Sequence, residues 1–79
     1  MTIDSVSLLR ELKSALEKLE EFKSKDCAHV IENLLQYDLD QSEAEKIKEI
    51  QGQLKMYEDD IAEKLLRELI VGLEKEDIQ

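Results

Sequence analysis

Cysteine and histidine are the side chains best suited to nucleophilic or phosphoryl-transfer chemistry near neutral pH, and this chain contains one of each, Cys27 and His29. Both lie in the stretch DCAHVIENLLQYDLD. A helix turns about 100° per residue, so His29 shares a face with Glu32 and Asn33 if this stretch is helical. The spacing therefore predicts a solvent-exposed imidazole, which is the placement that a histidine needs to exchange a phosphoryl group with a partner protein.

The same spacing predicts a different environment for Cys27. It falls on the apolar face with Val30 and Ile31, which is typical of a small core residue. A reactive thiolate would need cationic surroundings, yet Asp26 is adjacent and His29 faces away. One cysteine cannot form an internal disulfide, so we expect a reducing, cytoplasmic environment.

Acidic residues near the middle of the chain match part of a calcium-binding loop. Asp38 and Asp40 occupy loop positions 1 and 3, while Ser42 and Glu49 occupy positions 5 and 12. Position 6, where glycine permits the sharp turn, is Glu43. Capping of a helix N-terminus accounts for the same residues without a metal. The sequence also lacks a nucleotide-binding glycine loop, a zinc ligand set and a nucleophile–base–acid series, so we expect no metal, no cofactor and no enzymatic activity.

Composition and charge limit the classes of protein and partner. The 79 residues include no proline and two glycines, and 39% are charged, which favours helices over sheets. The chain has 20 acidic and 11 basic residues, for a net charge of −9. This charge opposes binding to nucleic acids and to anionic membranes. No apolar run is long enough to span a membrane, and we identify no signal segment.

Apolar residues recur at three- and four-residue steps in four segments. We therefore predict an all-α fold, a small antiparallel bundle of four helices that forms a single domain over 1–79. The predicted helices span approximately 5–22, 26–37, 42–56 and 60–74. The expected core residues are Leu12, Leu16, Leu19, Ile31, Leu34, Ile50, Leu54, Leu66 and Leu69. Phe22 and Tyr57 close the apolar stripes of the first and third helices.

The join between the third and fourth helices carries no glycine or proline. Continuing the third stripe by seven residues from Tyr57 and Ile61 reaches the charged Lys64 and Glu68. This loss of phase predicts a turn near Tyr57. The alternative is a continuous third helix, which would suit a coiled-coil dimer. Within the third helix, we expect Gly52 to permit close packing against a neighbouring helix.

The stretch MYEDDIAEKLLRELI resembles a recurring tail of multidomain bacterial signalling proteins. In that tail, an aromatic and acidic turn leads into a helix with an alanine and then leucines four and seven residues later. The matching residues are Tyr57, Ala62, Leu66 and Leu69, whereas Asp59 stands where a second aromatic residue is usual. Such tails belong to the phosphotransfer-like, C-terminal helical domains of hybrid sensor kinases, response regulators and diguanylate cyclases. The resemblance implies a fragment or a stand-alone version of such a signalling domain.

The histidine phosphotransfer family carries the motif His-x-x-Lys-Gly, in which the lysine holds the phosphoryl group and the glycine makes room for a partner. After His29, the corresponding positions are Glu32 and Asn33. A carboxylate one turn away would repel a phosphoryl group. The resemblance thus implies a degenerate, non-catalytic relative that docks onto a receiver domain or another signalling domain. Two alternatives stay open: a homo-oligomerising helical protein, and an active phosphotransfer protein that depends on His29.

Overall fold

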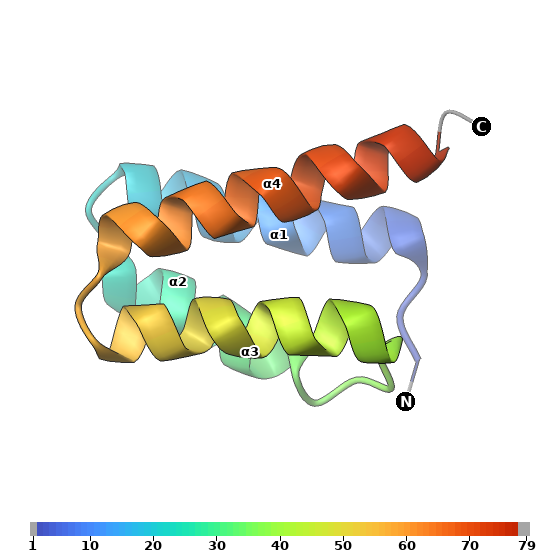
Figure 1. Cartoon of the computed structure of the whole chain (residues 1–79), viewed down its shortest axis with the longest axis horizontal. Helices are drawn as coiled ribbons and strands as arrows, with labels where there is room; N and C mark the ends of the chain where they lie inside the picture. Colours follow the sequence, from blue (N-terminus) through green and yellow to red (C-terminus); the bar gives the residue numbers. More distant parts are fainter. Residues whose placement is uncertain (1, 78–79) are drawn as a thin grey trace.

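Four helices follow one another along the chain. The structure, a computed structural model, describes the backbone of residues 2–77 and the side chains of residues 2–75. The helices are α1 (Ser5–Glu20), α2 (Ser24–Leu34), α3 (Gln41–Lys55) and α4 (Asp59–Asp77). Each helix packs against the next in the opposite direction, and α4 packs against α1, which closes the bundle (Figure 1). The predicted all-α bundle of four helices is confirmed, and the alternative of one continuous helix after α2 is wrong.

Helix α1 begins at Ser5 because the preceding residue caps it. Asp4 has an extended backbone, and its Oδ1 accepts a hydrogen bond from the Ser7 amide at 2.7 Å. That bond satisfies one of the first amides, which have no partner inside the helix. The same bond holds the pKa of the Asp4 carboxyl below its ordinary value of 3.8.

The turn between α1 and α2 is a Schellman motif. The Lys23 amide donates to the Lys18 carbonyl at 2.8 Å, and this is the outer of the two bonds that define the motif. The inner bond runs from the Phe22 amide to the Leu19 carbonyl at 3.1 Å. Phe22 has a φ of 63°, the left-handed conformation that the motif requires. Helix α1 therefore ends earlier than predicted, because these bonds satisfy its last carbonyls and turn the chain away.

The turn between α3 and α4 repeats this geometry. The Glu58 amide donates to the Gln53 carbonyl at 2.9 Å, and the Tyr57 amide donates to the Leu54 carbonyl at 3.2 Å. Tyr57 has a φ of 59°. The turn predicted near Tyr57 is confirmed. Because α1 and α3 run in the same direction, the two turns lie at one end of the bundle, on the left in Figure 1.

The starts of α2 and α3 rely on backbone bonds. Helix α2 begins at Ser24, two residues before the predicted start, with Lys23 at the N-cap. Helix α3 begins at Gln41 with Asp40 at the N-cap. Neither N-cap side chain accepts a hydrogen bond from a described helix amide. The tight turn after α1 leaves few residues before α2, so α2 begins earlier than the sequence alone predicts.

The ends of α2 and α4 also differ from the prediction. Helix α2 stops at Leu34, because the Gln36 amide reaches back only to the Asn33 carbonyl at 3.2 Å, in a tighter turn. Helix α4 continues to Asp77, three residues past the predicted end, and Gly72 does not interrupt it. As far as residue 77, none of the four helices is both long and apolar enough to cross a bilayer.

All four helices contribute to one hydrophobic core. The buried residues are Leu8, Leu12, Ala15, Leu19, Cys27, Ile31, Leu34, Ile47, Ile50, Leu54, Ala62, Leu66, Leu69, Ile70 and Leu73. Every expected core residue except Leu16 is among them. The prediction for Leu16 is wrong: it is half-buried at the edge of the core, beside the line of residues through which α1 faces the bundle.

The expectation that Gly52 permits close packing is also wrong. A Cβ atom built on Gly52 would meet no other atom within 4 Å. The glycine is half-buried in α3, and no neighbouring helix approaches it closely enough to require the missing side chain. Its presence is therefore not explained by packing.

Candidate functional site

His29 lies on α2 with its side chain exposed, as its spacing predicts. Glu32 and Asn33 are exposed one turn further along, and Lys25 is exposed one turn before. Within residues 2–75, no hydrogen bond or ion pair holds the imidazole. The structure therefore presents a freely solvated histidine with a carboxylate where the phosphotransfer motif has its lysine.

Cys27 is fully buried in the first turn of α2. Burial raises the pKa of the Cys27 thiol from its ordinary value of 9.0 to about 11, and the negative charge of Asp59 adds to this shift. The thiol is therefore protonated near neutral pH, and solvent does not reach it. The predicted core position of Cys27 is confirmed.

The acidic segment that matches a calcium loop does not fold as one. Helix α3 begins at Gln41, so Ser42 and Glu49 belong to the same helix. Seven residues of helix separate them by roughly 10 Å along the axis, whereas loop ligands must converge on one ion. In the part of the chain that the structure describes, no three His, Cys, Asp or Glu side chains are arranged to hold a metal ion.

The most exposed large apolar side chains gather at the end of the bundle that holds the two Schellman turns. Phe22 is 96% exposed, Tyr57 is 90% exposed and Met56 is 66% exposed. We call this end of the bundle the aromatic end, after the two aromatic residues among these three. A left-handed conformation costs an ordinary L-residue roughly 1 kcal/mol or more, and glycine avoids this cost. Two aromatic side chains thus occupy strained positions without burial in return.

An acidic groove of about 440 Å³ adjoins the aromatic end. It runs between the last turn of α1 and the first turn of α4. Its lining residues are Leu19, Glu20, Phe22, Asp59, Asp60 and Glu63. Four of these six side chains are carboxylates, and the other two are apolar. The groove therefore offers a hydrophobic contact and negative charge side by side.

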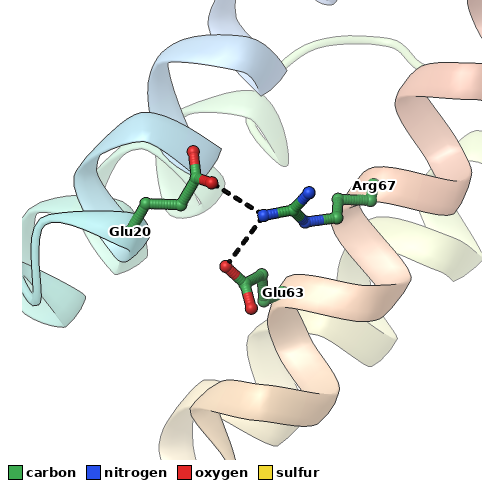
Figure 2. Close-up of polar contacts among 3 residues, drawn as sticks. All are labelled: Glu20, Glu63 and Arg67. Carbon is green, nitrogen blue, oxygen red and sulfur yellow. Dashed lines mark hydrogen bonds and ion pairs between the residues drawn. The ribbon is translucent and has the colours of Figure 1, made fainter.

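Arg67 is the cation that offsets part of this charge. Its Nη2 donates to Glu20 Oε2 at 2.7 Å and to Glu63 Oε1 at 3.2 Å (Figure 2). The bridge joins the C-terminal turn of α1 to α4, and all three side chains are at least one-third exposed. Asp59 and Asp60 lie in the first turn of α4, where the helix dipole favours them, but no described cation pairs with either. The four carboxylates and one guanidinium leave a net charge of −3 around the groove.

Sequence reasoning placed Phe22 and Tyr57 on core-facing stripes, and that prediction is wrong. A helical stripe continues only while φ and ψ stay helical, and both residues have positive φ. The left-handed conformation directs their side chains away from the core. A signal was available at Phe22: the stripe loses its phase directly after this residue, which indicates that the helix ends there and that Phe22 does not belong to the core.

Comparison with known proteins leaves the chain without an assigned relative. No protein-family model matches it, and no curated protein or solved structure matches it either.

Proposed function

We propose that this chain is a non-catalytic docking domain that binds a protein partner. The observation that supports this most strongly is the aromatic end, where Phe22 and Tyr57 are almost fully exposed in left-handed conformations. Aromatic side chains contribute strongly to protein–protein binding when a partner buries them. Strained residues that gain nothing within the fold point to a role outside it.

The chemistry of the two reactive residue types favours binding over catalysis. The pKa of Cys27 is raised, which keeps its thiol in the unreactive, protonated form. His29 is exposed, but Glu32 places a negative charge where a phosphoryl group would need a cation. Lys25 precedes the histidine, in the opposite direction from the lysine of the phosphotransfer motif.

The resemblance of Met56–Ile70 to tails of bacterial signalling proteins supplies the proposed context. In that context the chain is a degenerate relative of histidine phosphotransfer domains, and its partner is a receiver domain or another signalling domain. The four-helix architecture is compatible with this proposal. Homo-oligomerisation has less support, because the apolar stripes that suggested it bury themselves within one chain.

Titration of the isotopically labelled protein with isolated bacterial receiver domains, followed by NMR, tests the proposal. We expect the amide signals of 20–23 and 56–60 to shift on binding. Replacing both Phe22 and Tyr57 with glycine should abolish the shifts, since glycine keeps the turns and removes the side chains. Val6→Ala is the matched control, because Val6 is 61% exposed at the start of α1, away from the aromatic end.

Incubation with phosphorylated receiver domains tests the competing phosphotransfer function. We expect no acid-labile phosphoryl group on the protein. A label that appears on the wild type and disappears in His29→Gln would contradict the proposal and establish active phosphotransfer.

A further inference from the structure

We propose that the acidic groove and the aromatic end together bind a basic, amphipathic segment of a protein partner. The segment seats an apolar residue against Phe22 and places lysine or arginine side chains beside Asp59 and Asp60. This inference rests on the proposed docking function and names the chemistry of the partner.

The apolar part of the site lies at the end of the bundle that holds both Schellman turns. Phe22 and Leu19 line the side of the groove that α1 and its following turn form. Tyr57 lies in the turn two residues before Asp59, which lines the opposite side. A partner that covers these side chains removes a large apolar area from water, which favours binding.

The negative charge of the site favours a partner segment with positive charge. Glu20 and Glu63 share Arg67, so they are partly compensated within the chain. Asp59 and Asp60 have no cationic partner among the described residues, and they project from the first turn of α4. Lysine and arginine side chains on a partner would complete these pairs and accelerate association.

The same charge disfavours other occupants. Each copy of the chain has a net charge of −9, so two copies repel each other. A second copy seated with its own groove on this groove would also place carboxylates opposite carboxylates. Nucleic acids and anionic lipid surfaces carry the sign that this groove repels. A segment with cations on one side and an apolar stripe on the other meets both halves of the site, as amphipathic helices do when they enter grooves.

Fluorescence anisotropy with synthetic peptides tests this inference. The probe is an amidated peptide of about 16 residues made of lysine, leucine and alanine, with its leucines on one helical face. We expect it to bind the wild-type protein and to bind more weakly as NaCl is raised from about 0.05 M to about 0.5 M. A second peptide, in which glutamate replaces every lysine, should bind at least about ten-fold more weakly.

Two variants locate the binding. Asp59→Asn with Asp60→Asn should weaken binding of the basic peptide by about five-fold or more, through the lost charge pairs. Phe22→Gly should weaken it by a similar factor, through the lost apolar contact. The control is Glu32→Gln with Glu68→Gln, which removes two exposed charges from other parts of the surface and should leave affinity nearly unchanged. Circular dichroism confirms that each variant is folded.

The outcomes separate this inference from the docking function. If the control pair weakens binding as much as the Asp59 and Asp60 pair, the peptide senses only overall charge, and the inference is overturned. If a receiver domain shifts the turn signals but the basic peptide does not bind, docking stands and the basic partner is wrong. If the protein dimerises through the aromatic end, so that Phe22→Gly yields a monomer, a second copy is the occupant and the inference is overturned.

Discussion

Phe22 and Tyr57 hold the positions that glycine most often occupies after a helix. A bulky residue at such a position is usually explained by a stabilising contact that offsets the backbone strain. Their exposed fractions of 96% and 90% exclude such a contact within the described chain. Stability and the proposed binding would therefore make opposite demands on these two residues.

The first prediction follows from this opposition. Phe22→Gly should raise the free energy of unfolding by about 0.5–1 kcal/mol, because glycine adopts positive φ without strain and the exposed ring contributes little packing. Urea denaturation measures the change. Phe22→Ala is the control: it removes the ring but keeps the strain, and should unfold close to the wild type. A loss of more than about 1 kcal/mol in Phe22→Gly would show that the ring packs against the fold.

The second prediction concerns Cys27 and alkaline pH. The pKa of its thiol is about 11 in the folded protein, compared with an ordinary value of 9.0. The thiol therefore stays protonated to a higher pH in the folded state than in the unfolded state. The stability contributed by the neutral thiol is complete below pH 9 and is lost as the pH rises through about 11. Urea denaturation between these values should show a steeper decline for the wild type than for Cys27→Ala. Every other ionisable group is present in both proteins, so equal slopes would contradict the raised pKa of Cys27.

At the scale of whole helices, burial decides which leucines hold the bundle together. Leu66 is fully buried on α4, whereas Leu16 is half-buried on α1. We expect Leu66→Ala to lower the free energy of unfolding by about 2–5 kcal/mol, and Leu16→Ala to lower it by about 1–2 kcal/mol. Thermal melting of the two variants beside the wild type checks this order. Equal losses would mean that Leu16 faces the core.

The helices themselves follow from local sequence, and their ends follow only in part. The spacing of apolar residues by three and four positions places Ile31, Leu34 and Leu69 in the core, because each helix of the bundle buries only one face. The ends of α1 and α3 depend on two residues that take positive φ without being glycine, and side-chain type does not reveal that. The groove could not be predicted, because its two walls come from α1 and α4, which are distant in sequence.

At the scale of the whole molecule, the core and the charge both favour a single chain. The buried residues of the four helices form one cluster, and a charge of −9 makes identical surfaces repel each other. We expect light scattering behind a sizing column to give 9.2 kDa at every concentration tested, the mass of one chain. A mass near twice this value that persists on dilution would contradict the monomer and favour assembly as the function.

The up-and-down order of the helices also decides how the molecule can be tethered. Helix α1 begins and α4 ends on the side opposite the two Schellman turns (Figure 1). The 19 residues of α4 span about 28 Å, so that length separates its last turn from the groove. A linker, fluorophore or surface anchor attached at either terminus would leave Phe22 and Tyr57 facing outward. A protein immobilised through one terminus should therefore keep its aromatic end accessible to a binding partner in solution.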